Sequence, residues 1–539
     1  MSVTAAARPR VPLPVSPYQP RPHAGPGREE TLTLRREYLN PGVFHFYKEP
    51  LCIVDGHMQY LWDDQGRQYL DAIAGVVTVS VGHCHPKVTA ALREQVGRLV
   101  HTTTIYLHPN VALLGRELAR RMPKGSGLTS TYFTNSGSEA NELAILMSRL
   151  HTRNHDVLTL RNGYHGGTYL PMSLTAVGTW KFPVSSAGGI KHVAPGYCYR
   201  CPFGLKYPSC DVKCARSVED TIRYETSGQV ACFIAEPIQG VGGVVTPPKE
   251  YFQIVYEIVR RHGGLCIADE VQTGFGRTGE RYWGFENWGV TPDMVTMAKG
   301  IANGSPLGAC TTRPEIAEQM KQRVHFNTFG GNPVSAAAGL ATLAAIDEDG
   351  IQQNAKQVGE YLKDKLLGLR EKYCGEGSRD RGIEGSTGQG AEGPRDQGTD
   401  VRRHEGAEGR RDEGTKPRRE GAEGRRDEGM KRLGSADAPP LRAARGGGRA
   451  GVVIGEVRGL GLMLGVELVK DAQTKEPASA ETAQVMDLAK DRGLLLGKGG
   501  LYGNVLRIKP PMCITRADCD FLVDCLDECL ELINRRATT

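Results

Sequence analysis

An acidic residue and a lysine follow two short apolar segments in the middle of this 539-residue chain. Residues 265–268, Leu-Cys-Ile-Ala, precede Asp269, and residues 294–298, Met-Val-Thr-Met-Ala, precede Lys299. Short apolar runs flanked by Gly and Pro are typical of fully buried parallel strands. Because ligands bind at the carboxyl ends of the strands in open α/β sheets, we expect Asp269 and Lys299 to face one crevice.

A buried lysine and a buried carboxylate in this arrangement suit pyridoxal 5'-phosphate (PLP). A desolvated lysine amine loses its proton more easily, so it can form a Schiff base with the PLP aldehyde. A carboxylate that faces the pyridine nitrogen keeps this nitrogen protonated, and the ring can then accept the electrons of a substrate carbanion. The alternative for the two residues alone is a structural ion pair, so the segment between them decides.

That segment contains residues 270–279, Glu-Val-Gln-Thr-Gly-Phe-Gly-Arg-Thr-Gly, which resemble the signature of the class III (fold type I) PLP-dependent aminotransferases. The resemblance covers roughly residues 36–374 and 451–535. It implies an α/β fold with a large domain around a mostly parallel central sheet, and a smaller α+β domain built from the chain ends. Within the family, residues 77–86 and 326–333 are most similar to alanine–glyoxylate aminotransferase 2-like enzymes.

A phosphate-binding segment is predicted at residues 134–141, Thr-Asn-Ser-Gly-Ser-Glu-Ala-Asn, between a strand-like segment and an amphipathic helix. Small residues at the start of a helix leave backbone N–H groups free for a phosphate, and the helix dipole favours the anion. Ser-Gly-Ser is also an ordinary helix N-cap. Together with Lys299, the pattern predicts that Ser136, Gly137 and Ser138 form the cofactor phosphate site.

The resemblance implies further cofactor contacts. It places Tyr164 against the face of the pyridine ring and makes Gln272 a candidate partner of the ring hydroxyl. Thr328 is expected to reach the phosphate of a neighbouring subunit. The implied assembly is a homodimer, or a dimer of dimers, with shared active sites.

Two charged residues are candidates for substrate binding. Glu236 follows the apolar segment 231–235, and Arg507 lies within Leu-Arg-Ile-Lys-Pro-Pro at residues 506–511. In similar enzymes this glutamate pairs with the arginine and releases it when a substrate α-carboxylate arrives. A guanidinium group binds a carboxylate with two parallel hydrogen bonds. The alternative is an ordinary surface arginine, but the apolar neighbours of Arg507 favour the substrate role.

The resemblance implies a transaminase that moves an amino group from a small amino acid, alanine-like or an ω-amino donor, to a 2-oxo acid such as glyoxylate or pyruvate. Gly167 and Val76 fit small substrates, because ornithine-type enzymes often carry an arginine and a tyrosine near these positions. Three alternatives stay open: a phospho-lyase acting on phosphoethanolamine or phosphohydroxylysine, another ω-aminotransferase, and a catalytically silent binding protein. Intact Lys299 and Asp269 disfavour the last.

Two clusters of sulfur and nitrogen side chains could suggest a metal. The His-Cys-His run at residues 83–85 lies between Gly82 and Pro86, which favours a tight loop before a helix. A second cluster could bind zinc, undergo redox or disulfide chemistry, or simply pack; it consists of Cys198, Cys201, Cys210 and Cys214. Its intervening loop is shorter than in most zinc ribbons, and the family does not require such a site. We predict no metal cofactor.

The net charge of +6 is small for this length and indicates no nucleic-acid partner. No apolar run is long enough to span a bilayer, so no membrane partner is expected. The cysteines are scattered over predicted buried segments, which favours reduced thiols and a cytoplasmic location. Seven prolines interrupt the acid-free segment 1–27 and argue against the amphipathic helix of a transit peptide.

The expected organisation has five parts. The identical sequence Glu-Gly-Ala-Glu-Gly-Arg-Arg-Asp-Glu-Gly occurs at 405–414 and 420–429, within a Gly/Arg/Glu-rich stretch that contains too few apolar residues to fold. The parts are a disordered tail at 1–30, the N-terminal segment of the small domain at 31–80, the large PLP-binding domain at 81–340, the C-terminal small domain at 341–374 and 450–539, and the disordered repeat insert at 375–449.

Overall fold

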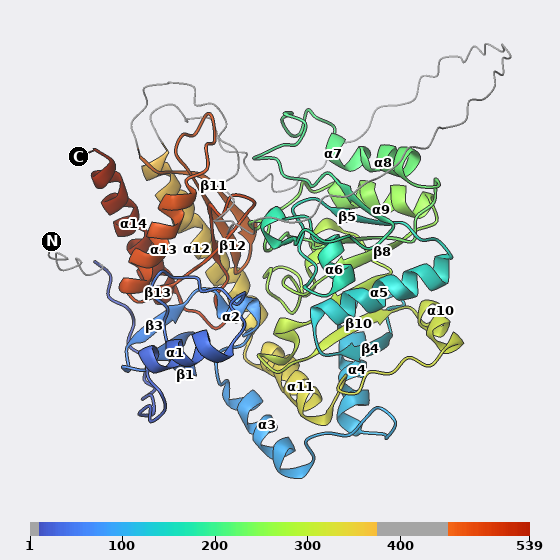
Figure 1. Ribbon diagram of the computed structural model, residues 1–539, viewed down its shortest axis with the longest axis horizontal. Helices are drawn as coiled ribbons and strands as arrows, with labels where there is room; N and C mark the ends of the chain where they lie inside the picture. The colour runs from blue at the N-terminus through green and yellow to red at the C-terminus, as the bar shows by residue number, and fades with distance from the viewer. Residues whose placement is uncertain (1–9, 375–450, 539) are drawn as a thin grey trace, which may run out of the picture. The chain divides into compact units, whose positions relative to one another are not determined.

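A mixed seven-stranded sheet contains the predicted strands of the site (Figure 1). The computed structural model describes residues 10–374 and 451–538, so the repeat insert at 375–449 lies outside the described residues. In spatial order the strands are β4 (Ser130–Thr134), β10 (Gly308–Thr312), β9 (Met294–Met297), β8 (Leu265–Asp269), β7 (Cys232–Ala235), β5 (Val157–Leu160) and β6 (Ile190–Val193). Strand β10 is antiparallel to both of its neighbours, β4 and β9, and the other neighbouring pairs of this sheet are parallel. The expected mostly parallel α/β sheet is confirmed.

Helices cover both faces of this sheet. Helix α5 (Gly137–Thr152) packs in a core cluster with Cys232, Ile234 and Ile267. Helix α9 (Tyr251–Arg261) belongs to a second cluster with Phe233 and Cys266. Because successive side chains of a strand point to opposite faces, the alternation between the two clusters places the helices on opposite sides of the sheet. Burial on both faces explains why these strands are apolar runs without polar alternation.

The two ends of the chain form two smaller sheets. One has the order β1 (Ile53–His57), β2 (Tyr60–Asp63), β3 (Gln68–Asp71) and β13 (Leu494–Leu495). The other has the order β11 (Val453–Leu460), β12 (Met463–Val469), β15 (Val505–Ile508) and β14 (Gly497–Gly499). Strands β3 and β13 pair in parallel, so an N-terminal and a C-terminal segment share one sheet (Figure 1). The division into the predicted domains stays a prediction.

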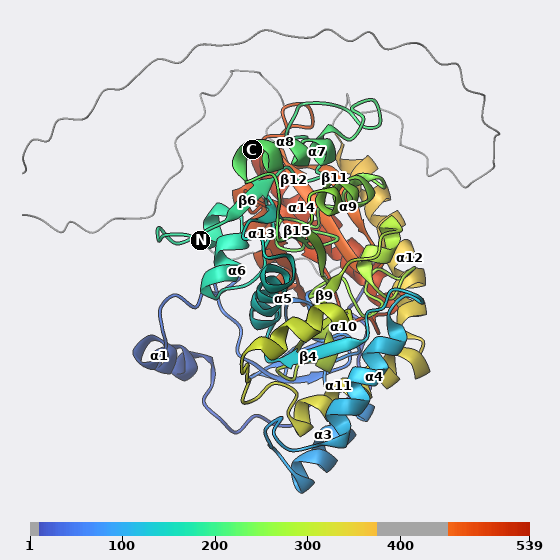
Figure 2. The same ribbon diagram turned by 90° about the vertical axis from the view of Figure 1, so that its right-hand side faces the viewer.

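Other helices connect or cover these sheets. They are α1 (Arg28–Tyr38), α2 (Ala74–Val77), α3 (Pro86–Arg98), α4 (Pro109–Arg121), α6 (Tyr169–Leu174), α7 (Lys213–Arg216), α8 (Val218–Glu225), α10 (Pro314–Ala317), α11 (Pro333–Glu348), α12 (Ile351–Tyr373), α13 (Ser479–Asp491), α14 (Arg516–Thr538) and the 3-10 helices η1 (Gly178–Trp180), η2 (Gly284–Trp288), η3 (Lys299–Ala302) and η4 (Glu318–Gln322). Helix α11 contacts both α3 and α4 (Figure 2). No helix of the described segments is long and apolar enough to cross a bilayer.

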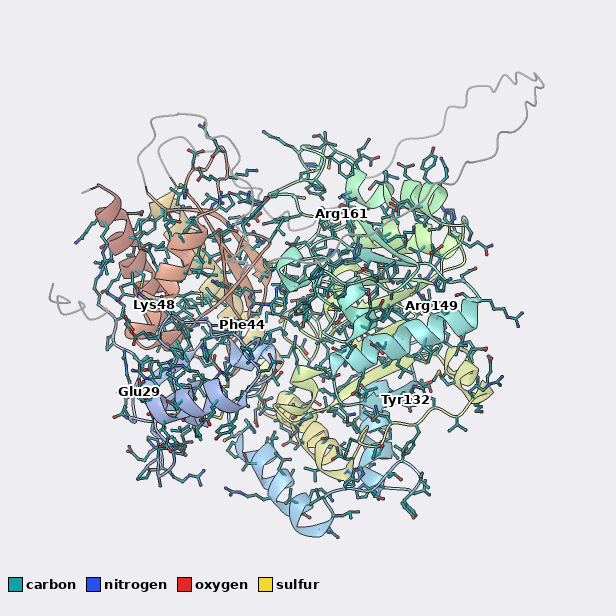
Figure 3. The ribbon with its side chains drawn as sticks, in the orientation of Figure 1. Glu29, Phe44, Lys48, Tyr132, Arg149 and Arg161 are labelled. Atoms are coloured by element: carbon teal, nitrogen blue, oxygen red, sulfur yellow. The ribbon has the colours of Figure 1, made fainter. Side chains whose placement is uncertain are left out.

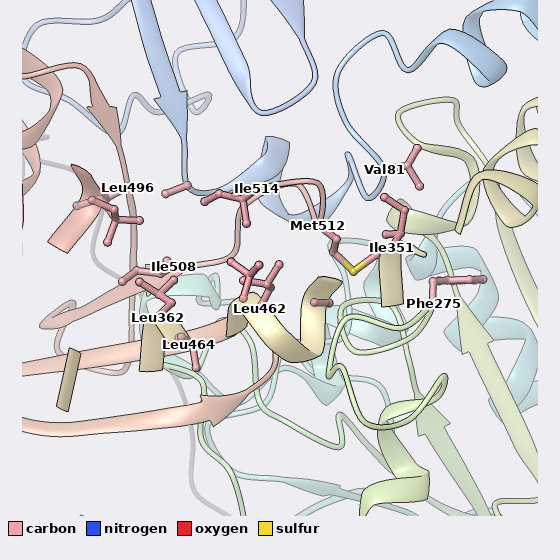
Figure 4. Packing of buried hydrophobic residues seen from close by; sticks show 14 of the residues in the cluster. Val81, Phe275, Ile351, Leu362, Leu462, Leu464, Leu496, Ile508, Met512 and Ile514 are labelled. Atoms are coloured by element: carbon pink, nitrogen blue, oxygen red, sulfur yellow. The ribbon is translucent and has the colours of Figure 1, made fainter. Parts of the chain in front are cut away.

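The segment that follows β15 is anchored in the main hydrophobic core. Ile508, Met512 and Ile514 belong to one buried cluster with Phe275 and Leu462 (Figure 4). Burial of such side chains stabilises a fold by about 1.5–3 kcal/mol each. The same cluster therefore holds the C-terminal segment in a fixed place beside the loop that follows β8.

The predicted disordered tail at residues 1–30 is wrong for residues 10–30. The backbone N–H groups of Arg10 and Val11 donate to the carboxylates of Glu528 and Asp524, at 3.0 and 2.8 Å. The Tyr18 ring stacks on a histidine ring with centroids 4.6 Å apart, and α1 begins at Arg28. Prolines exclude a helix over most of this segment, but they permit an extended chain that carries such contacts.

Candidate active site

Strands β8 and β9 bring Asp269 and Lys299 to one crevice. Asp269 pairs with Thr296 in the parallel register, and Lys299 begins the 3-10 helix that follows β9. The residues that line this crevice come from five segments of the chain: Gly137, Ser138, Asn141, Tyr164, His165, Gly166, Glu236, Asp269, Val271, Gln272, Ala298 and Lys299. Seven of them were predicted from the sequence: Gly137, Ser138, Tyr164, Glu236, Asp269, Gln272 and Lys299. Asn141 and His165 were missed.

Lys299 is held in a conformation and an environment suited to a reactive amine. Its φ of 50° lies in the left-handed region, which costs a non-glycine residue about 1–2 kcal/mol and is often found at functional sites. Burial lowers the pKa of the Lys299 amine to about 8, and the nearby Arg507 cation acts in the same direction. Asp269 and Glu236 oppose this shift. A larger fraction of the amine is therefore unprotonated near neutral pH than for a solvated lysine.

Three N–H groups hold the buried Asp269 carboxylate. Asn141 Nδ2 donates to Oδ2 at 2.9 Å, His165 Nδ1 lies 2.8 Å from the same oxygen, and the Val271 backbone N–H donates to Oδ1 at 3.2 Å. Because a carboxylate oxygen only accepts, Nδ1 carries the ring proton, and Nε2, which lies 3.1 Å from the Thr159 hydroxyl, accepts from that hydroxyl. These contacts compensate the carboxylate for burial and fix its direction.

The sequence contained a signal for both missed residues. Asn141 lies four residues after Gly137 on α5, so the two lie on the same face of the helix. His165 directly follows Tyr164 in the chain. Neither residue type indicates by itself that it hydrogen-bonds a carboxylate on another strand, and the tertiary structure supplies that information.

The N-terminus of α5 opens onto the crevice and has room for an anion. A Cβ atom on Gly166, whose φ is 135°, would lie 2.3 Å from Ser138 Oγ, and one on Gly137 would lie 3.0 Å from Val271 Cγ2. Ser136 is the N-cap and accepts from a backbone N–H of the first turn at 3.2 Å, and it is not among the lining residues. Helix N-termini bind phosphate through free N–H groups and the helix dipole, so Gly137 and Ser138 fit the phosphate of PLP.

Tyr164 and Glu236 occupy another wall of the crevice. The backbone N–H groups of Tyr164 and Gly240 donate to the two Glu236 oxygens, at 2.9 and 2.8 Å. Burial raises the pKa of Glu236. The Tyr164 ring lies edge-on to Trp180 with centroids 5.1 Å apart, and Trp180 in turn contacts Phe44, which is labelled in Figure 3. Aromatic side chains therefore extend outward from the crevice.

Arg507 is a buried cation with free hydrogen-bonding groups. It lies on β15 between Gly497 of β14 and Gly465 of β12, and a Cβ on Gly499 would lie 2.8 Å from Arg507 Cδ. Its Nε and Nη1 atoms have no partner within the described part of the chain. Burial lowers the pKa of Arg507 to about 10, while nearby Glu236 favours the charged form. Buried donors are normally satisfied, so an unpartnered guanidinium fits an anionic ligand.

Glu236 and Arg507 form no ion pair among the residues that the structure describes. The glutamate oxygens instead accept the two backbone N–H groups given above. Glu236 nevertheless acts electrostatically on Arg507 and opposes the lowering of the Arg507 pKa. The described arrangement thus leaves the arginine available.

Thr328 does not line the crevice of its own chain. It is exposed, within a loop whose neighbours Val324, Phe326 and Phe329 are also exposed. The Phe329 ring contacts His101 at 5.1 Å, which connects this loop to another segment with exposed apolar side chains. That segment contains Val100, Ile105, Tyr106 and Leu107. Contiguous exposed apolar surface of this kind is typical of protein–protein contacts.

The described residues contain no group of three or more His, Cys, Asp or Glu side chains placed to hold a metal ion. In the His-Cys-His run at residues 83–85, His83 Nε2 lies 2.8 Å from Asp71 and His85 Nε2 lies 3.0 Å from Asp349. The second cluster lines one small cavity, and all its thiols are free: Cys198, Cys201, Cys210 and Cys214.

Comparison with known proteins agrees with this geometry. The family model of class III aminotransferases matches residues 45–385 and 448–530. Alanine–glyoxylate aminotransferase 2 homolog 2, mitochondrial, of Arabidopsis thaliana is 43% identical over 515 residues, which cover 96% of this chain and 90% of that protein.

Two solved structures are also similar. An amine transaminase from an uncultivated Pseudomonas species in its PLP-bound form has a TM-score of 0.71 and 27% identity, covering 92% of this chain and 98% of that chain. A phospholyase from Arthrobacter in complex with phosphoethanolamine has a TM-score of 0.72 and 28% identity, covering 93% of this chain and 99% of that chain. The chain belongs to the class III aminotransferase family.

Proposed function

We propose that this aminotransferase uses PLP attached to Lys299 and moves the amino group of a small amino acid, alanine or an ω-amino donor, to a 2-oxo acid such as glyoxylate or pyruvate. The observation that carries the proposal is the shared crevice of Lys299, Asp269 and the α5 N-terminus. The name of the Arabidopsis thaliana relative supports the choice of alanine and glyoxylate.

Each residue of the crevice has a task toward the cofactor. When bound, PLP supplies an aldehyde for the amino group and a ring that withdraws electrons from it. The Lys299 amine is the attachment point and, once released, can move a proton from the substrate Cα. Asp269, held by Asn141 and His165, keeps a proton on the pyridine nitrogen. Tyr164 covers the ring and Gln272 binds its hydroxyl.

Arg507 is the group that binds the substrate carboxylate. Its unpartnered Nε and Nη1 atoms can donate two parallel hydrogen bonds, and the low-polarity surroundings strengthen them. Glu236 lies near enough to balance the arginine charge when no substrate is bound. Val76 and Gly167 provide no charged group for a second carboxylate or an additional amine, which favours a small substrate.

The active enzyme is a homodimer with shared sites. Support comes from the exposed apolar side chains of the loop around Thr328, and Thr328 does not line the crevice of its own subunit. In the proposed dimer Thr328 hydrogen-bonds the cofactor phosphate of the partner. A cytoplasmic location stays our expectation from the free thiols, whereas the Arabidopsis thaliana relative is named mitochondrial.

Two incubations test the reaction. With alanine and glyoxylate, the purified enzyme should yield pyruvate and glycine in equal amounts. The second candidate function is a phospho-lyase, favoured by the similarity to the Arthrobacter structure, and it should release inorganic phosphate from phosphoethanolamine. Phosphate release without pyruvate or glycine would replace the transaminase with the lyase.

The cofactor attachment is tested separately. Lys299→Ala should fold normally but lack the visible absorbance of lysine-bound PLP. Lys363→Ala is the control, because Lys363 is a partly buried lysine that donates to Gly459 O, outside the crevice. Its spectrum should equal that of the wild type. Equal spectra for the wild type and Lys299→Ala would show that Lys299 is not the residue to which PLP is attached.

A further inference from the structure

A second buried lysine lies against the crevice. Lys509 has no exposed surface, and its Nζ lies 2.9 Å from Gln272 Oε1 and 3.3 Å from Gly240 O. No carboxylate of the described residues forms an ion pair with it. Buried lysines without a charged partner are rare because the charged form loses its hydration. The burial of Lys509 without an acidic partner therefore needs an explanation.

The surroundings favour a neutral amine with two hydrogen bonds. Burial lowers the pKa of Lys509 well below its usual value, and the neighbouring cations Arg507, Lys299 and Arg277 act in the same direction, opposed by Glu236. A neutral amine has two N–H bonds, and the structure offers it two oxygen acceptors. Both N–H bonds are thereby satisfied without a counter-ion.

These contacts determine the orientation of the Gln272 amide. With its oxygen held by Lys509, the amide NH2 group is left for the crevice that Gln272 lines. A Cβ on Gly240 would lie 2.4 Å from the same Gln272 oxygen, so the amide also lies tightly against this backbone. An NH2 group is the end that can donate to an anionic ring oxygen, whereas the carbonyl end would repel it.

Lys509 itself is fixed by the C-terminal segment that carries Arg507. Its backbone N–H donates to Ala72 O at 2.8 Å. The next residue, Pro510, accepts from the buried Arg277 guanidinium, and Ile508 and Met512 are in the main core (Figure 4). The segment thus presents Arg507 to the substrate side and Lys509 to Gln272 from one rigid support.

We propose that Lys509 is a positioning residue that holds the carbonyl oxygen of Gln272 and so turns the amide NH2 toward the ring hydroxyl of the cofactor. This inference rests on the proposed PLP function. Lys509 acts on the cofactor only through Gln272, and no contact between Lys509 and the substrate is required.

A double-mutant cycle tests the proposal with Lys509→Met, Gln272→Ala and the combined variant. The readouts are the dissociation constant of PLP, from quenching of tryptophan fluorescence in the apoenzyme, and the absorbance maximum of bound PLP. Each single variant should weaken PLP binding about tenfold, because a buried hydrogen-bonding group loses its partner. The combined variant should be no weaker than Gln272→Ala, and the absorbance shifts should also coincide.

Lys363→Met is the control, since it removes a partly buried lysine that donates to Gly459 O, outside the crevice, and it should bind PLP like the wild type. A combined variant weakened by the product of the two single effects, about a hundredfold, would overturn the proposal. Unchanged binding and absorbance in Lys509→Met would also overturn it.

Circular dichroism identifies variants that do not fold. If Lys509→Met is among them, Lys509→Gln replaces it, because a glutamine keeps N–H groups at this position. Near-wild-type PLP affinity in Lys509→Gln supports the proposal. The proposal is contradicted if Lys509→Gln folds and weakens PLP binding by the same factor with and without Gln272→Ala. A wild-type protein that takes up no PLP shows instead that the proposed function itself is wrong.

Discussion

At the scale of single residues, the site combines a lysine that is easily deprotonated with a carboxylate that is held in place. Burial is the main cause of the first property, since it lowers the pKa of Lys299 to about 8. Hydrogen bonds from Asn141, His165 and the Val271 backbone give the second. One prediction concerns the lowered pKa of Lys299, and another concerns the hydrogen bonds that hold Asp269.

The first concerns the pH dependence of cofactor uptake. Only the unprotonated Lys299 amine attacks an aldehyde, and its fraction rises as the pH passes through about 8. The rate of PLP uptake by the apoenzyme should therefore rise with pH and level off above about pH 9. Stopped-flow absorbance measures this rate. Uptake of PLP by a free lysine derivative in the same buffers is the control, and a rate that still rises tenfold per pH unit near pH 10 contradicts the assignment.

The second concerns the support of Asp269. Asn141→Leu removes one donor to the buried carboxylate, and kcat should fall about 10- to 100-fold while PLP remains bound. Ser148→Ala is the matched control, because Ser148 is buried on the same helix but its hydroxyl donates to Ala144 O and does not line the crevice. Steady-state kinetics with absorbance of bound PLP separate the two effects. Equal kcat in both variants would show that Asn141 does not support catalysis.

At the scale of the elements, the start of α5 and the loop after β5 approach each other closely. Gly166→Ala would place a Cβ 2.3 Å from Ser138 Oγ and strain a φ of 135°, so the phosphate-binding turn would have to shift. We expect PLP affinity to fall at least about tenfold. The adjacent Gly167→Ala is the control, since a Cβ there meets no atom within 4 Å. Fluorescence titration of the apoenzymes compares them, and similar affinities would contradict the predicted clash.

At the scale of the whole molecule, shared active sites allow two defective variants to complement each other. In a mixed dimer of Lys299→Ala and Thr328→Glu, one site carries both defects and the other carries neither. Half of the dimers are mixed after subunit exchange, so about one quarter of wild-type activity should return. The unmixed variants, measured at the same total concentration, are the controls. No recovery in a mixture shown to exchange subunits would exclude the shared site.

The repeat insert should be dispensable. Joining residue 377 to residue 449 removes a Gly/Arg/Glu-rich segment with few apolar residues, and long surface loops change closure entropy only slowly with length. Activity and melting temperature should stay near those of the full chain, as measured by the transamination assay and calorimetry. A large fall in melting temperature would show that the insert contributes to stability.

The sequence by itself determined the strands and the helix start that position the cofactor site. Strands β7, β8 and β9 are apolar because both faces are buried, and parallel strands bring their carboxyl ends to one edge of the sheet. Asp269 and Lys299 follow from this local rule. The anion site at the start of α5 was predicted from its N-cap and small residues, because the first turn of a helix leaves N–H groups free.

Only the tertiary structure decided which distant groups meet these residues. Lys509 hydrogen-bonds Gln272, and Asn141 hydrogen-bonds Asp269, although no periodicity in the sequence indicates either contact. Residues 74–77 form a left-handed turn, although two of them are valines, with φ values of 52°, 56°, 62° and 66°. Such a turn is unfavourable locally and needs support, here from Asp71, which accepts the N–H groups of Ile73 and Ala74. Periodicity and capping depend on neighbours in the chain, whereas these features depend on packing between segments far apart in sequence.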